Sequence, residues 1–258
     1  MPDSISVSQA MRYNRQIVLP QIDLAGQEAL LNASVLVIGV GGLGNAAAMS
    51  LATSGVGSLT LVDPDTVETH NLPRQWLFRD DQTGSKKVIA ACDTLNQRAP
   101  DCQINTVAHS ADDDELKDLI QHHDVVLDCT DNAQSRDQIN RVSYLARKPL
   151  ISGAAIRFEG QLFVCQPGSG SSCYACLRTL FEAPDVSCTE AGILSPVVSL
   201  TGLHQALLAI KLITGAGNIP VGQLMLFDAL TYDWQTFSVP KKPDCNVCSA
   251  SANVSENK

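Results

Sequence analysis

A short apolar run that ends in a cluster of glycines sets the strongest limit on the fold of this chain. Residues 35–39 read VLVIG, the chain continues VGGLGN, and small residues follow over 46–52. Gly39, Gly41 and Gly44 match the pattern G-x-G-x-x-G between a strand and a helix. Glycines at these positions allow a tight turn and let phosphate oxygens approach backbone N–H groups at the helix N-terminus. The pattern therefore predicts a nucleotide site.

The glycines alone do not distinguish the pyrophosphate of a dinucleotide from the triphosphate of ATP. Asp63 ends the next apolar run and is placed to bind ribose hydroxyls in either case. A Walker A loop is excluded because no Gly-Lys-Ser/Thr follows. A tight strand–helix turn that binds nothing is the remaining alternative.

Strand-like and helix-like segments alternate through the first part of the chain. The expected strands are 35–39, 58–63, 103–108, 124–130 and 149–156, and the expected helices are 45–54, 85–99, 112–123 and 134–148. This alternation predicts an α/β fold, a Rossmann-like, doubly wound and mostly parallel sheet with helices on both faces.

The alternation stops after residue 156. Residues 158–167 read as an extended segment, and 222–240 as two strands around a turn, so antiparallel C-terminal strands should extend the sheet. The apolar run 192–215 contains Pro196 and Lys211, which favours a buried or interface helix over a membrane span. We expect one domain over 1–250, with an N-terminal helical arm (1–32) and a nucleotide-binding part (33–156), and a disordered polar tail over 251–258.

Charge and cysteine content limit the partners and the compartment. The 258-residue chain has a net charge of −9, which argues against a nucleic-acid partner. No secretory signal is visible at the start, and the nine cysteines are an odd number. These observations favour a reducing compartment, and so a cytoplasmic protein without a disulfide framework.

Cationic side chains cluster after the second predicted strand. Asn71 and Arg74 lie in HNLPRQ, and Lys87 ends GSKK. A triphosphate needs its charge neutralised, and arginine and lysine supply this, whereas an NAD enzyme has no need of such a cluster. The alternative is a solvated loop with scattered charges.

The segment DCTDN follows the fourth predicted strand, at the sheet edge where ligands bind. Asp131 is a candidate ligand for Mg²⁺, which prefers a few carboxylates together with phosphate oxygens. The same residue could instead cap the helix that begins near Ala133. One side chain cannot readily do both.

Two C-x-x-C pairs, CYAC and CNVC, supply Cys173, Cys176, Cys245 and Cys248. Four thiolates in two such pairs suit a closed, tetrahedral structural zinc site. The metal would hold the C-terminal region against the middle of the chain. A redox pair or four free thiols are the alternatives.

The motifs RYNRQ, GVGGLG, NLPRQ, DCTDN, SGAAI and the two C-x-x-C pairs occur in this order between Arg12 and Cys248. In this the chain resembles the ThiF family, the bacterial relatives of ubiquitin-activating enzymes that adenylate small sulfur-carrier proteins. The resemblance implies a homodimer that uses Mg-ATP to activate the C-terminal glycine of a ubiquitin-like carrier for thiocarboxylate formation. Residues 157–250 would then bind carrier and zinc.

The resemblance also implies residue roles. The phosphates would be bound by Gly39, Gly41, Gly42, Gly44, Asn71, Arg74, Lys87 and Asn132, the ribose by Asp63, and magnesium by Asp131. Arg15 would reach into the partner subunit's site, and Cys188 matches a cysteine that links covalently to the carrier in some members. Pro73 departs from the glutamine that the family usually has.

The family has a molybdopterin branch and a thiamine branch. SGAAIRFEGQ and LFEAPDVSCTEAG favour the molybdopterin branch, and other stretches are compatible with the thiamine branch. No rhodanese domain follows Cys248, so sulfur is expected from another protein such as a cysteine desulfurase or a rhodanese. Two other functions stay open: an NAD-dependent oxidoreductase, suggested only by the glycines and Asp63, and a non-catalytic module that docks ubiquitin-like proteins.

Overall fold

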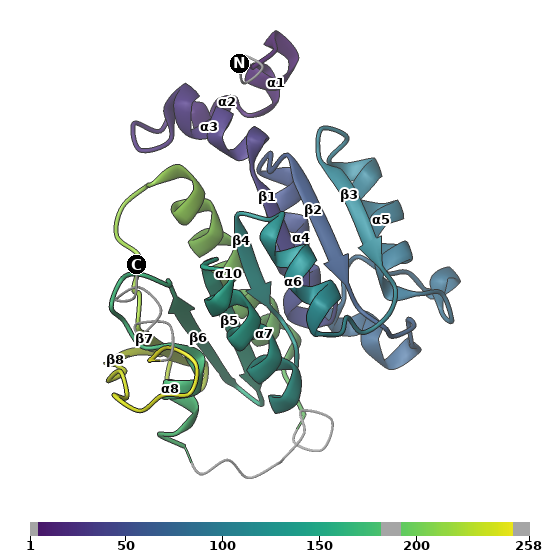
Figure 1. Cartoon of the computed structure of the whole chain (residues 1–258). Helices are drawn as coiled ribbons and strands as arrows, with labels where there is room; N and C mark the ends of the chain where they lie inside the picture. The colour runs from purple at the N-terminus through teal and green to yellow at the C-terminus, as the bar shows by residue number, and fades with distance from the viewer. Residues whose placement is uncertain (1–4, 182–191, 250–258) are drawn as a thin grey trace.

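The computed structural model describes residues 5–181 and 192–249, which form one mixed sheet covered by helices on both faces (Figure 1). Its eight strands lie in the order β3-β2-β1-β4-β5-β6-β7-β8. The parallel strands are β1 (Ser34–Ile38), β2 (Ser58–Val62), β3 (Gln103–Val107), β4 (Val125–Asp128) and β5 (Leu150–Ile156). The antiparallel strands are β6 (Glu159–Cys165), β7 (Gln223–Asp228) and β8 (Asp233–Ser238). The predicted fold class, including the antiparallel extension, is confirmed.

The helices divide between the two faces of the sheet. One face carries α3 (Asp23–Asn32), α4 (Gly42–Thr53), α5 (Lys87–Arg98) and α10 (Ser195–Thr214), and the other α6 (Asp113–Gln121) and α7 (Ala133–Leu145). The shorter elements are α1 (Val7–Arg12), α2 (Asn14–Ile17), α8 (Tyr174–Arg178) and the 3₁₀ helices η1 (Thr69–Arg74) and η2 (Asp80–Gln82). Strand β1 is buried on both faces: Val35 and Val37 join one core, and Leu36 and Ile38 the other.

The turn between β1 and α4 has the geometry that only glycine tolerates. Gly39 has a φ of +89°, in the left-handed region. A Cβ on Gly44 would lie 1.9 Å from the carbonyl oxygen of Gly39. Helix α4 begins at Gly42, three residues before the predicted start at 45, because the glycines themselves form its first turn.

Helix α10 is long and apolar enough to cross a membrane by length and composition, but it packs inside the fold. It lies against α4 and β5, and Gly202 makes the approach to α4 possible: a Cβ there would lie 2.2 Å from the carbonyl oxygen of Leu43. This packing accounts for its composition. Leu200, Leu203 and Leu207 nevertheless stay partly exposed on one side of the helix.

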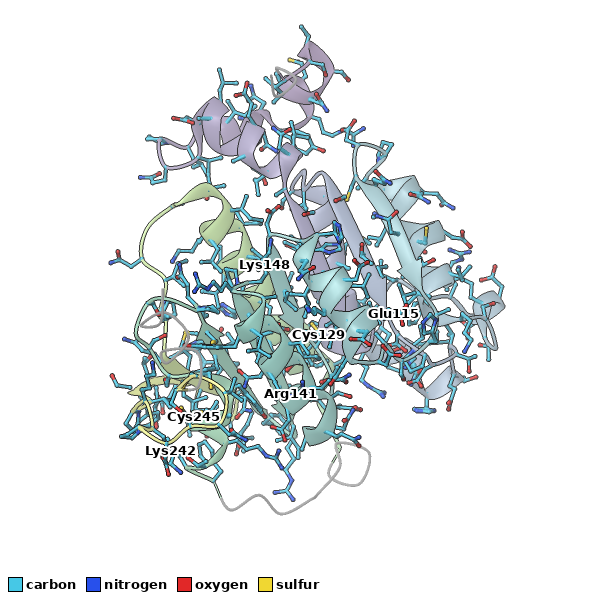
Figure 2. All side chains as sticks on the ribbon, in the orientation of Figure 1. Glu115, Cys129, Arg141, Lys148, Lys242 and Cys245 are labelled. Atoms are coloured by element: carbon cyan, nitrogen blue, oxygen red, sulfur yellow. The ribbon has the colours of Figure 1, made fainter. Side chains whose placement is uncertain are left out.

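The C-terminal segment returns to the antiparallel end of the sheet. Figure 2 shows Lys242 and Cys245 beside this end, and Cys245 packs in the same core as Phe163 of β6 and Leu224 of β7. The predicted connection between the end of the chain and its middle is therefore present in the structure.

Candidate functional site

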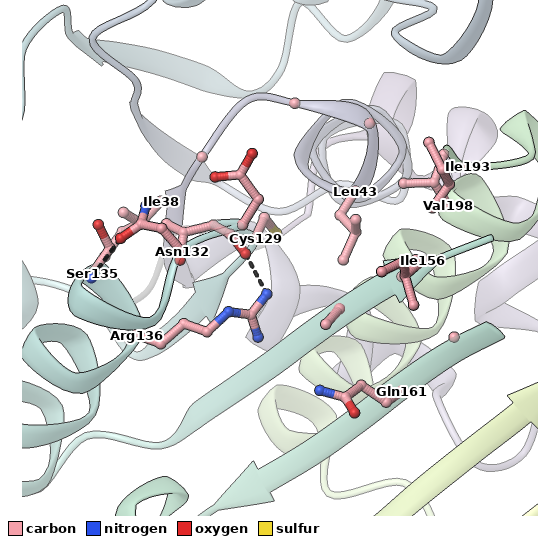
Figure 3. Close-up of a pocket in the computed structure, with 18 of the residues that line it drawn as sticks. Ile38, Leu43, Cys129, Asn132, Ser135, Arg136, Ile156, Gln161, Ile193 and Val198 are labelled. Atoms are coloured by element: carbon pink, nitrogen blue, oxygen red, sulfur yellow. Dashed lines mark hydrogen bonds between the residues drawn. The ribbon is translucent and has the colours of Figure 1, made fainter. Parts of the chain in front are cut away.

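A cavity of about 1130 Å³ opens at the carboxyl ends of the parallel strands and continues along the antiparallel strands. The wall formed by the glycine loop lies where the strand order changes direction between β1 and β4, the usual ligand position in such sheets. The cavity brings together nine predicted site residues: Gly39, Gly41, Gly42, Asp63, Asn71, Arg74, Lys87, Asp131 and Asn132. Part of the lining is drawn in Figure 3.

The glycine loop presents the N-terminus of α4 to the cavity. Gly41 is the N-cap and has no side chain to bond the first-turn N–H groups. The buried Asn45 fixes the loop, since its Nδ2 donates to the Val40 carbonyl (2.9 Å) and its Oδ1 accepts from the Leu77 N–H (2.7 Å). Uncapped N–H groups and the helix dipole together favour an anion here.

Asp63 ties the end of β2 to the glycine loop. Its Oδ2 accepts from the Val40 N–H (2.7 Å) and its Oδ1 from the Asp65 N–H (2.9 Å). Burial raises the pKa of this carboxyl, and nearby Lys87 and the two backbone donors oppose the shift. A carboxylate has about four lone-pair positions, so two remain for hydroxyl donors.

The cationic side chains are held at the cavity wall. Lys87 is buried, and its Nζ lies 2.8 Å from Oδ2 of Asp65, which leaves further donors on the ammonium group. Arg74 donates from Nη1 to the His70 carbonyl (2.7 Å). Lys87 is thus fixed by burial, which differs from the alternative of a solvated loop, whereas the Arg74 contact is exposed; both side chains line the cavity that the glycine loop borders.

The helix cap after β4 is provided by Asn132. Its backbone is extended (φ −125°, ψ 146°), and its Oδ1 accepts from the Ser135 N–H at 2.8 Å, as Figure 3 shows. Asp131, which the sequence left open between a cap and a metal ligand, is exposed and lines the cavity. The cap therefore does not occupy its carboxylate.

The remaining predicted residues lie elsewhere. Gly44 does not line the cavity, and its small size serves the contact with Gly39. Arg15 lies on α2 in the N-terminal arm, at the opposite end of the sheet from the cavity (Figure 1). Its action on a partner's site therefore stays a prediction. Cys188 and the tail over 251–258 lie outside the described residues.

Sequence reasoning missed Gln75 and Arg136, two buried polar residues that line the cavity. Gln75 ends the motif NLPRQ, and its Oε1 has no hydrogen-bond partner within the part of the chain that the structure describes. The motif NLPRQ was the sequence feature that could have indicated Gln75 as a site residue. Arg136 gave no signal, because an arginine in an amphipathic helix ordinarily reads as a surface residue.

The four cysteines of the C-x-x-C pairs form a compact, buried cluster. Their sulfurs lie within 4.8 Å of one another, with Cys173–Cys245 at 3.7 Å and Cys176–Cys248 at 3.5 Å. Zinc–sulfur bonds of about 2.3 Å in a tetrahedron place sulfurs about 3.8 Å apart. The cluster is therefore compatible with zinc, and none of these four cysteines is in a disulfide.

Neighbouring groups support the cysteine cluster from α7 and from the C-terminal segment. Asn140 Nδ2 donates to the Cys173 sulfur (3.8 Å), and the Lys242 N–H to the Cys176 sulfur (3.4 Å). Burial raises the pKa of Cys173 to about 11, and a divalent cation is what offsets that cost for thiolates. The donor set thus fits a structural metal.

The comparison with known families agrees with this arrangement. The ThiF family model matches residues 13–247. The chain belongs to the ThiF family. The family predicted from the ordered motifs is thereby confirmed.

Two ThiF-family relatives match almost end to end. The molybdopterin-synthase adenylyltransferase of Escherichia coli (strain K12) is 45% identical over 244 residues, which cover 95% of this chain and 98% of that protein. The sulfur carrier protein ThiS adenylyltransferase of the same organism is 42% identical over 241 residues, 93% of this chain and 96% of that protein. The crystal structure of E. coli MccB shares the fold, with a TM-score of 0.81, 22% identity, and coverage of 95% of this chain and 74% of that one.

Proposed function

We propose that this chain catalyses the ATP-dependent adenylation of the C-terminal glycine of a ubiquitin-like sulfur carrier, the small subunit of molybdopterin synthase. The near-complete match to a molybdopterin-synthase adenylyltransferase supports this assignment. The observation that carries it is one cavity that joins the glycine loop to the antiparallel strands. The same reaction on the thiamine-pathway carrier is the second candidate, because the ThiS adenylyltransferase is nearly as similar.

The nucleotide end of the cavity suits a triphosphate. The N-terminus of α4 offers backbone donors, and Arg74 and Lys87 supply positive charge beside it. Asp63 has acceptor positions left for ribose hydroxyls. Asp131 is the carboxylate that would hold magnesium, since the helix cap does not use it. When bound, the ion would neutralise charge on the phosphates.

The opposite end of the cavity suits an extended polypeptide tail. Gln161, Leu226 and Gln235 line it from three adjacent strands in direct register. Small-molecule pockets usually measure about 300–1,000 Å³. The observed 1130 Å³ leaves room for a nucleotide together with the end of a carrier protein.

The reaction needs no nucleophile from the enzyme. A carboxylate oxygen of the carrier attacks the α-phosphorus of ATP, the bond between that phosphorus and the bridging oxygen breaks, and pyrophosphate leaves. The product is a carrier acyl-adenylate. The enzyme's contribution is alignment and charge neutralisation, which the held cations and the uncapped helix provide. The later sulfur step uses a donor such as a cysteine desulfurase or rhodanese, with Cys188 as the candidate for a covalent link.

The proposed enzyme also includes a structural zinc ion and a second copy of the chain. Zinc in the cysteine cluster would fix the C-terminal segment to α8 without taking part in the chemistry. A second copy of the chain would cover Leu200, Leu203 and Leu207, and the homodimer would bring Arg15 to the partner's cavity. The lack of disulfides among the described cysteines suits a cytoplasmic location.

Pyrophosphate–ATP exchange tests the assignment. We expect exchange that depends on the molybdopterin-type carrier, and a carrier that gains the mass of AMP. Exchange with the thiamine-type carrier alone would assign the chain to the thiamine branch of the family. NADH binding without exchange would support the oxidoreductase alternative, and carrier binding without exchange would leave only a docking module.

Adjacent lysines provide a matched pair for the same assay. Lys87→Ala should abolish most exchange, because Lys87 lines the cavity. Lys86→Ala is the control, since Lys86 is exposed, does not line the cavity, and donates from Nζ to the Pro64 carbonyl. Equal loss in both variants would contradict the assigned role of Lys87.

A further inference from the structure

Thr130, the residue directly before Asp131, is fixed by a fully buried carboxylate. Asp128, the last residue of β4, has no solvent exposure. Its Oδ1 accepts from both the N–H (3.0 Å) and the Oγ1 hydroxyl (2.7 Å) of Thr130. Both donors of Thr130 are therefore held on one side.

The carbonyl of Thr130 is held on its other side by Arg136. This arginine is 7% exposed and extends from α7 toward the end of β4 (Figure 3). Its Nη2 donates to the carbonyl oxygens of Thr130 and of Gly153, the latter at 2.9 Å. Its Nη1 donates to Ser152 Oγ (3.3 Å), and Ser152 in turn donates to Asp128 Oδ2 (2.8 Å). These bonds close a ring of four residues: Thr130, Asp128, Ser152 and Arg136.

Arg136 and Asp128 are buried opposite charges joined through Thr130 and Ser152, and burying charges in this way is rarely a gain in stability by itself. Burial disfavours the charged form of Arg136, and the Asp128 carboxylate offsets this, so the pKa of Arg136 lies above its ordinary value. Replacing such pairs with apolar groups is often neutral or stabilising. The ring is also not needed to begin α7, because Asn132 provides the cap. What the ring does fix is the turn that carries Asp131.

We propose that Arg136 is a positioning residue that, with Asp128, locks Thr130 and so aims the Asp131 carboxylate into the cavity as a magnesium ligand. The inference rests on the proposed function, in which Asp131 holds the ion beside the phosphates. Groups that orient a metal ligand typically change metal affinity or activity about 10–100-fold when altered. Arg136 acts only by positioning Asp131 and takes no direct part in the reaction.

The test is a double-mutant cycle on the gain in ATP affinity that Mg²⁺ provides, measured as the ratio of ATP Kd without and with Mg²⁺ by calorimetry. Arg136→Lys keeps the charge but loses the planar fork that reaches two carbonyls. We expect it to reduce the ratio about 10-fold or more. Asp131→Asn should remove most of the ratio, and adding Arg136→Lys to that variant should change it no further.

Arg141→Lys is the matched control, since Arg141 is an exposed arginine of the same helix (Figure 2) that pairs with Asp113 at 2.8 Å. Its Mg²⁺ ratio should equal that of the parent. Thermal unfolding accompanies each measurement. If Arg136→Lys does not fold, Thr130→Val carries the same cycle, because it removes the hydroxyl bond to Asp128 at nearly constant volume.

The outcomes distinguish the positioning role of Arg136 from the proposed function. A parental Mg²⁺ ratio in folded Arg136→Lys, or an equal cost of this change with and without Asp131, would overturn the positioning role and leave the proposed function standing. A parental ratio in Asp131→Asn would instead overturn the magnesium role of Asp131, and the positioning role with it.

Discussion

Alanine at Gly44 should destabilise the fold, because the required space is occupied by backbone. The added Cβ would lie 1.9 Å from the Gly39 carbonyl oxygen, whereas real Cβ contacts are essentially never under 3.0 Å. The Gly39 backbone cannot easily move away, since its N–H donates to the Val62 carbonyl (2.8 Å). The Cys129 carbonyl also packs closely against Gly39, at the position where a Cβ would lie. Such overpacking costs about 3 kcal/mol. The better helix propensity of alanine returns up to about 1 kcal/mol.

The net loss of about 2 kcal/mol corresponds to a decrease in Tm of about 4–8 °C for a chain of this size. Differential scanning calorimetry measures it. Gly41→Ala is the control, because its Cβ would meet nothing closer than 3.9 Å; it should keep the parental Tm yet weaken ATP binding, as Gly41 lines the cavity. A parental Tm for Gly44→Ala, or a larger decrease for Gly41→Ala, would refute the packing argument.

Three other outcomes follow from the site. Metal analysis should find about one zinc per chain; Cys245→Ser should lose it and lower the Tm, while Cys92→Ser, outside the cluster, should do neither. Burial raises the pKa of Asp63 above its ordinary 3.8, so the carboxyl ionises less readily in the folded chain than in the unfolded chain. Its contribution to the free energy of unfolding should therefore fall as the pH rises from about 3.8 through the pKa that Asp63 has in the folded chain. The stability difference between the parent and Asp63→Asn, measured by urea unfolding across that range, should show this slope, and a flat difference would contradict it. Mixing Arg15→Ala with Asp131→Ala subunits should restore exchange if Arg15 acts in the partner's site, and absence of rescue would remove that role.

Some residues were assignable from the sequence because their chemistry is local. The turn after the strand needs a left-handed φ, which glycine adopts readily, so Gly39 marks that turn in the sequence. Each C-x-x-C pair likewise fixes the spacing of its own thiols. The sequence could not show that the two pairs meet. Contacts between Cys173 and Cys245 depend on β6, β7 and β8 returning the chain to the same place.

The strand–glycine–helix unit, the α/β class and the family were predictable from the sequence, because they depend on local sterics, hydrophobic period and ordered motifs. The folded chain was needed to show that Asn132 rather than Asp131 caps α7, and that Arg136 is buried in a ring with Asp128. A cap depends on backbone angles, and the burial of a charge depends on which strands pack around it. Neither is fixed by the identity of the residue.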